Sequence, residues 1–105
     1  MAQGLPYMVQ KIRGTAPEQQ VKGVFQALSG AIQTYEEDHG RYPEGETDLY
    51  FGNIVYLKEM YCGEARGDYA YHCEFTPKGY LVTATPLRQG LPRYRMGPGP
   101  VVERF

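Results

Sequence analysis

The stretch TAPEQQVKGVFQALSGAIQTYEEDHGRYP, residues 15 to 43, decides the fold of this chain. Its apolar side chains recur at spacings of three and four, which is the period of an α-helix that buries one face. The members of this apolar stripe are Val21, Val24, Phe25, Leu28, Ala31, Ile32 and Tyr35. The pattern predicts one long helix over residues 16 to 39, with the stripe packed into the protein core.

Both ends of the predicted helix carry recognisable signals. Thr15 and Glu18 have the spacing of a capping box, and Pro17 lies in the first turn, where its missing N–H costs little. At the other end, Gly40 is suited to a left-handed C-cap, and Pro43 pushes the residue before it toward an extended backbone. We therefore expect the helix to end just before Gly40.

The face opposite the stripe carries small residues. At about 100° per residue, four of them fall on one strip of the helix. These are Gly23, Ala27, Gly30 and Thr34. An interior glycine costs a helix about 1 kcal/mol relative to alanine, whereas small side chains let a second helix approach closely. Two interpretations stay open, a helix–helix packing face and a solvated face that happens to carry small residues.

Upstream of this helix, Leu5, Met8, Val9 and Ile12 also recur at helical spacing. The periodicity favours one continuous helix, whereas the capping signal at Thr15 favours a break. Both alternatives remain open.

Beyond residue 43 the sequence changes character. EGETDLYFGN (44–53) is typical of a loop, and IVYLKEMYC (54–62) is a short apolar segment compatible with either helix or strand. Apolar and polar residues then alternate over 69–76, a turn follows, and a β-branched segment runs to residue 85, which predicts an antiparallel hairpin. Residues 93–104 are compatible with a further, irregular hairpin.

These elements predict a single α+β domain over residues 1–105, with a long N-terminal helix packed on a small antiparallel sheet. A helical stalk spans about 5–40, and a head of loop and sheet spans 41–105. The formal net charge of -1 argues against nucleic acid as a partner. No apolar run approaches the roughly 18 to 20 residues that span a bilayer.

Residues 5–43 resemble the N-terminal helix of type IV pilins and type II secretion pseudopilins. The resemblance rests on Pro6, early in the helix, and on the sequence Gly40-Arg41-Tyr42-Pro43 at its end. The segment YHCEFTPKGYLVTATP (71–86) also resembles the sheet of that family. The resemblance implies a structural subunit of a pilus or pseudopilus, with no enzymatic activity and no cofactor.

The same resemblance carries further expectations. The partners would be other subunits and the assembly machinery, and the small strip would face neighbouring helices. The protein would be held on the periplasmic side of the bacterial inner membrane by the family's apolar N-terminal helix, which residues 1–105 lack, and would later enter the filament. On that expectation the chain is a soluble fragment. Tyr42 would pack back on the end of the helix as a structural residue.

The family's major pseudopilins also carry an Asp-Pro-Trp-Gly-like segment, and this chain has no tryptophan. Glu44, Glu46 and Asp48 do not by themselves supply a calcium site, so no metal is predicted. His39, in the last helical turn, is expected to interact with the helix C-terminus or with solvent.

A disulfide between Cys62 and Cys73 is predicted, because it closes a short loop and suits a periplasmic or extracellular head. A cysteine nucleophile with His72 as its base is disfavoured, because His72 and Cys73 are adjacent on a strand and point to opposite faces. A zinc site lacks the usual close Cys-x-x-Cys pair. Besides these enzyme and metal readings, a soluble periplasmic binding or adaptor module with a disulfide-stapled helix-plus-sheet fold remains an alternative to the filament subunit.

Overall fold

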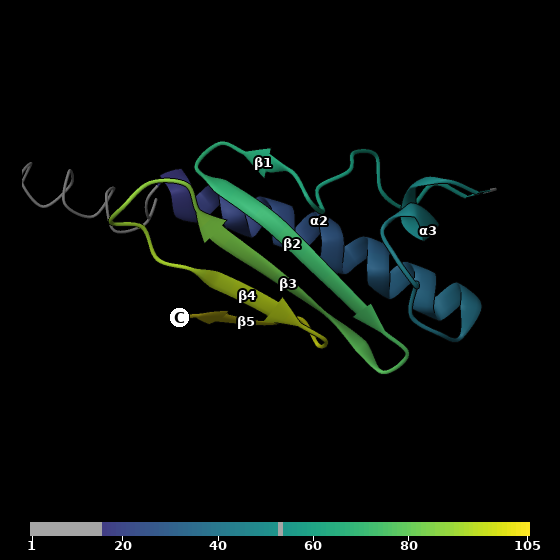
Figure 1. Cartoon of the computed structure of the whole chain (residues 1–105). Coiled ribbons are helices and arrows are strands. Elements are labelled where there is room, and N and C mark those ends of the chain that lie inside the picture. Colours follow the sequence, from purple (N-terminus) through teal and green to yellow (C-terminus); the bar gives the residue numbers. More distant parts are fainter. Residues whose placement is uncertain (1–15, 53) are drawn as a thin grey trace, which may run out of the picture.

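The computed structural model describes residues 16–52 and 54–105 (Figure 1). Helix α2 (Ala16–His39) lies along one face of an antiparallel sheet whose five strands follow the order β1-β2-β3-β4-β5. The predicted α+β arrangement is therefore confirmed. The capping role of Thr15 and the helical pattern upstream of it lie outside the described residues.

Helix α2 has the predicted bounds, and its apolar stripe forms one side of the core. All seven members of the stripe are buried, and Leu28 is fully so. Gly40 adopts the left-handed conformation, with φ +74°, and its N–H donates to the carbonyl of Glu36 at 2.8 Å. The helix thus ends as the sequence predicts, because glycine reaches this conformation without the steric cost of a side chain.

The predicted hairpin consists of β2 (Tyr69–Thr76) and β3 (Gly79–Pro86). Its register pairs Tyr71 with Ala84 and Cys73 with Val82. Because alternate residues share a face, the tyrosines of β2 point toward the helix, where the Tyr71 ring meets that of Phe25 edge-on at 6.4 Å. The tyrosines at positions 69, 71 and 80 are buried, so they replace the missing tryptophan as large core residues.

The second hairpin is also present. It joins β4 (Tyr94–Gly97) to β5 (Val101–Arg104), and Met96 pairs with Val102. Every residue of β5 is exposed, and this strand forms one edge of the sheet (Figure 1). The opposite edge is β1 (Ala65–Arg66), which could not be predicted from the sequence because two residues show no alternation.

The connection between helix and sheet differs from the prediction. The segment expected to be loop contains a one-turn helix, α3 (Thr47–Tyr50), whose Leu49 is fully buried. The N–H groups of Tyr56 and Leu57 both donate to the Leu49 carbonyl, at 2.9 and 3.0 Å. Residues 54–62 form neither a helix nor a strand, the two elements compatible with their sequence. They fold irregularly around the α3 turn.

Tyr42 was expected to pack back on the end of the helix, but its ring contact lies on the sheet instead. Its ring packs against that of Tyr80 on β3, with ring centroids 6.0 Å apart, at the edge of the core. Pro43 beside it is buried. The corner after the helix is therefore attached to the sheet.

Candidate functional site

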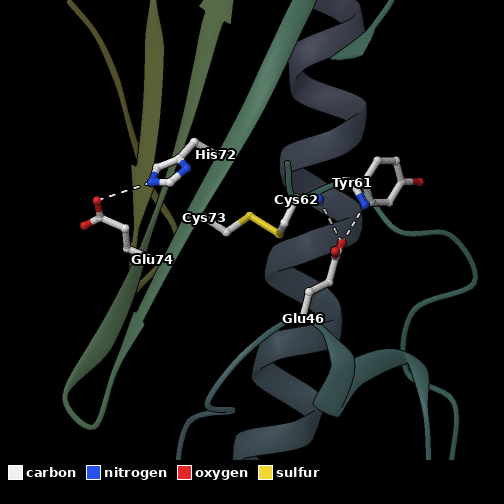
Figure 2. Close-up of a disulfide and its surroundings, with 6 residues drawn as sticks. All are labelled: Glu46, Tyr61, Cys62, His72, Cys73 and Glu74. Atoms are coloured by element: carbon white, nitrogen blue, oxygen red, sulfur yellow. Dashed lines mark hydrogen bonds and ion pairs between the residues drawn. A yellow bond between two sulfur atoms is a disulfide. The ribbon is translucent and has the colours of Figure 1, made fainter. Parts of the chain in front are cut away.

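The predicted disulfide is present. Cys62 and Cys73 are bonded with an S–S distance of 2.05 Å and Cα atoms 5.4 Å apart (Figure 2). Cys73 lies on the helix-facing side of β2 and Cys62 on the incoming connection, so the bond ties the connection to the sheet. Both thiols are consumed, so neither can serve as a nucleophile or as a thiolate ligand for zinc while the bond is intact.

Glu46 is a buried carboxylate next to the disulfide, only 7% exposed. Its Oε2 accepts hydrogen bonds from the backbone N–H groups of Tyr61, at 2.5 Å, and Cys62, at 3.0 Å (Figure 2). Its Oε1 is buried and has no hydrogen-bond partner among the described residues. This role could not be predicted from the sequence, because nothing local distinguishes Glu46 from Glu44.

Two of the three carboxylates considered for calcium accept hydrogen bonds from the backbone. Asp48 Oδ2 accepts from the Glu44 N–H at 2.9 Å, and Glu46 holds the backbone beside the disulfide. Within residues 16–52 and 54–105, no group of three or more histidine, cysteine or acidic side chains is placed to hold a metal ion.

His72 points away from the disulfide, as predicted from strand alternation. Its Nε2 lies 3.4 Å from Glu74 Oε2, and both side chains are exposed. Figure 2 shows this pair on the side of β2 opposite the disulfide. The side chains of His72 and Cys73 therefore lie on opposite faces of the sheet.

His39 interacts with the end of the helix, as expected. Its Nδ1 lies 3.1 Å from the Tyr35 carbonyl, and its ring stacks on the Tyr35 ring at 3.9 Å. Beside it, the Tyr56 hydroxyl donates to the Asp38 carboxylate at 2.8 Å, and this bond raises the pKa of Tyr56. These contacts attach the connection to the last turn of α2.

The small strip of α2 points away from the core at three of its four positions. Gly23, Gly30 and Thr34 are exposed, whereas Ala27 is partly buried and packs against the core. A Cβ atom added at Gly23 or Gly30 would meet nothing within 4 Å apart from the helix backbone and chain neighbours. Contacts among the described residues therefore do not explain why glycine occupies these positions.

A groove of about 500 Å³ lies between α2 and the second hairpin, and we call it the β5 groove. Phe25, Met96 and Val102 give it an apolar lining, and Lys22 and Arg104 contribute positive charge to it. The complete lining is Glu18, Val21, Lys22, Phe25, Gln26, Ser29, Tyr94, Met96, Pro100, Val102 and Arg104. The groove could not be predicted from the sequence, because it depends on how far the sheet extends past the helix.

Charge is unevenly distributed along the chain despite the net charge of -1. Ten of the twelve acidic residues lie between residues 36 and 74, together with only three basic ones. Residues 78–105 carry five basic residues and one acidic residue, Glu103, which pairs with Arg95 at 2.7 Å. The segment from the end of α2 to β2 is thus acidic, and the part of the chain that holds β4 and β5 is basic.

Exposed apolar side chains gather in two places. After α3, the side chains of Phe51, Ile54 and Val55 are 64%, 57% and 58% exposed, and we call these three residues the α3 patch. The second group, at β5, includes Val102, which is 51% exposed. Large apolar side chains gathered on a surface indicate an interaction site more strongly than single ones do.

No helix in the described part of the chain is long and apolar enough to cross a membrane. Comparisons of this chain with protein-family models, with curated proteins and with solved structures gave no match.

Proposed function

We propose that the protein is a structural subunit of a type IV pilus or type II secretion pseudopilus, and that α2 packs against the helices of neighbouring subunits. The observation that carries the proposal is the open space over Gly23 and Gly30 on the exposed face of α2. The role is structural and not catalytic. The partners are other subunits and the machinery that assembles them.

Gly23 and Gly30 weaken the helix in which they lie. Each costs the helix about 1 kcal/mol relative to alanine. Packing within the described residues does not offset that cost, since a side chain at either position would meet open space. Packing against a second helix along the strip would offset it, because small residues let two backbones approach closely. From Gly23 to Thr34 the strip is roughly 16 Å long, which is enough for three helical turns of contact.

The disulfide supports the proposed location. Disulfides persist in oxidising compartments such as the bacterial periplasm and are rare in the cytosol. We therefore place the subunit on the periplasmic side of the inner membrane before assembly. It would later become part of the filament.

Substitution of Gly30 tests the proposal at two levels. Gly30→Leu should leave the unfolding free energy of the isolated chain unchanged or raise it by up to about 1 kcal/mol, because the position is open and leucine is a better helix former than glycine. Gly30→Ala should match the wild type or exceed it by up to about 1 kcal/mol. In the organism that produces the protein, Gly30→Leu should abolish filament assembly or secretion, and Gly30→Ala should largely preserve it.

Gln33→Leu provides the matched control. Gln33 is exposed on the same helix, roughly 90° around the axis from the strip, so leucine there should not block assembly. If Gly30→Leu unfolds the isolated chain, the strip belongs to the protein's own core. If Gly30→Leu leaves assembly intact, the strip is a solvated face and the proposal is wrong.

The alternative function is a soluble periplasmic binding or adaptor module with a disulfide-stapled helix-plus-sheet fold. The β5 groove favours it, since an apolar lining with a few charged groups suits a ligand. This alternative requires a chain that stays monomeric at all concentrations and whose activity in the cell is unaffected by Gly30→Leu.

A further inference from the structure

We propose that the β5 groove binds the α3 patch of a second copy of this chain, so that copies associate head to tail. The inference rests on the proposed function and deepens it, because it adds a contact between heads to the contact between helices. Four observations support it: the lining of the groove, the exposed patch, the charges beside each, and their separation along α2.

The groove has the chemistry of an incomplete core. Phe25 and Met96, which line it, are almost completely buried and belong to the protein's main hydrophobic cluster. Val102, on the edge strand, completes the lining and is half exposed. An apolar side chain from a partner placed here would extend the core and remove Val102 from water.

The α3 patch supplies side chains of the required kind. Phe51, Ile54 and Val55 are each more than half exposed, in a connection that otherwise buries Leu49 and Leu57. A groove of about 500 Å³ is large enough for side chains of this size, although an open groove need not be filled completely. The same chain therefore carries both an apolar groove and an exposed apolar patch.

The charges beside the two surfaces are complementary. Lys22 and Arg104 line the groove, and the one acid there, Glu18, lies 3.8 Å from Lys22. Asp48 lines a hollow together with two residues of the α3 patch, and Asp38 lies close by, bonded to Tyr56 of that hollow. Arg41, bonded to Tyr35 of the same hollow, offsets one of these two acidic charges and leaves the other in excess. Opposite charges of this kind steer association and set its orientation, and salt screens them.

The two surfaces lie at different positions along α2. The groove is lined by helix residues between 18 and 29, whereas the patch shares its hollow with Tyr35 and His39. The centres of these helix segments are roughly 20 Å apart along the axis. Figure 1 likewise shows α3 beside the C-terminal part of α2, while β5 forms an edge of the sheet. A copy cannot fill its own groove, so the contact joins different surfaces and can continue from copy to copy.

Two blocked variants test this geometry. Val102→Glu places a charge in the groove, and Ile54→Glu places one in the patch. Both positions are exposed, so circular dichroism should show that both variants fold. Sedimentation velocity at low salt and up to about 1 mM protein should show self-association of the wild type, weakened at least about tenfold in each variant.

The decisive sample is the equimolar mixture of the two variants. One intact groove and one intact patch remain between them, so the mixture should form dimers that do not grow further. Wild-type chains should instead form a concentration-dependent series of larger species. Added salt should weaken both associations.

Leu87→Glu is the matched control. Leu87 is 55% exposed, as exposed as Val102, but belongs neither to the groove nor to the patch. This variant should associate like the wild type. An equal loss of association in Leu87→Glu would show non-specific apolar contact and overturn the proposal.

Two further results would overturn it. A wild-type chain that stays monomeric at about 1 mM and low salt lacks the contact. If the mixture stays monomeric while the wild type associates, the wild type associates through another surface. Gly30→Leu separates this inference from the proposed function, since it should leave head-to-tail association unchanged while blocking filament assembly. If the mixture of the two variants stays monomeric while Gly30→Leu still blocks filament assembly, the head-to-tail contact is wrong and the proposed function is retained.

Discussion

The helix–hairpin unit, formed by α2, β2 and β3, and the connection over residues 41–64 are stabilised in different ways. In the unit, a continuous stripe of helix residues meets the alternating inner face of two paired strands. The connection has little regular structure and is attached at separate points: the buried Leu49, the Glu46 carboxylate, the disulfide and the Tyr56–Asp38 hydrogen bond. Distributed burial tolerates small changes, whereas a segment attached at few points depends on each of them.

The largest effect should come from the centre of the unit. Leu28→Ala should lower the free energy of unfolding by about 2 to 5 kcal/mol, since Leu28 is fully buried between helix and sheet and its removal leaves a cavity. Urea denaturation measures this loss. Leu87→Ala, at an exposed leucine, should change stability by less than about 0.5 kcal/mol. A loss under about 1 kcal/mol for Leu28→Ala would mean that the stripe does not form the core.

The next effect belongs to the connection. Replacing both cysteines, by Cys62→Ser with Cys73→Ser, should cost about 3 kcal/mol, because the disulfide closes a loop between residues 11 positions apart. Before the substitution, thiol titration of the denatured, unreduced protein should find almost no free thiol. Hydrogen exchange should then show increased opening of the connection, with α2 and the hairpin still protected. Uniform loss of protection would contradict the separation of the two regions.

Alkaline pH should weaken the unit through its buried tyrosines. Burial raises the pKa of Tyr71 to about 12, so the folded chain keeps this proton after the unfolded chain has lost it near pH 10. Stability should therefore fall as the pH rises from about 10 to about 12, by at most about 2 to 3 kcal/mol from Tyr71. Burial also raises the pKa of Tyr69, Tyr80 and Tyr94, which act in the same direction.

Tyr71→Phe isolates the contribution of this residue. The variant should lose part of the alkaline decline in unfolding free energy, and at neutral pH it should cost less than about 1 kcal/mol. The reason is that the Tyr71 hydroxyl is buried with no hydrogen-bond partner among the described residues. An unchanged alkaline profile would show that Tyr71 ionises in the folded protein as readily as in the unfolded chain.

The last prediction tests a single polar contact of the connection. Glu46→Ala should cost about 1 to 3 kcal/mol, because the N–H groups of Tyr61 and Cys62 lose a charged acceptor. Combined with the double cysteine replacement, it should cost less than the sum of the separate effects, since both hold the same segment. Additive losses measured by urea denaturation would show that the two contacts act independently.

Several features of the fold and of the candidate site could be predicted from the sequence. The bounds of α2 follow from apolar periodicity and from Gly40, and the hairpin over 69–85 follows from alternation. Cys62 and Cys73 could be paired because only two cysteines exist and an oxidised head was expected. The small strip was visible as well, although Ala27 proved to be partly buried at the edge of the core.

The sequence by itself determined the elements whose side chains repeat at a regular period, because local backbone geometry converts such a period into one buried face. Only the tertiary structure decided the roles of Glu46, Leu49 and the β5 groove. Glu46 is a buried acceptor because the fold brings the N–H groups of residues 61 and 62 beside its carboxylate. Helix α3 is stabilised by burial of Leu49 in the core. The groove exists because Val102 pairs with Met96 on a strand that extends past the helix. These are contacts between distant segments, and no local pattern specifies them.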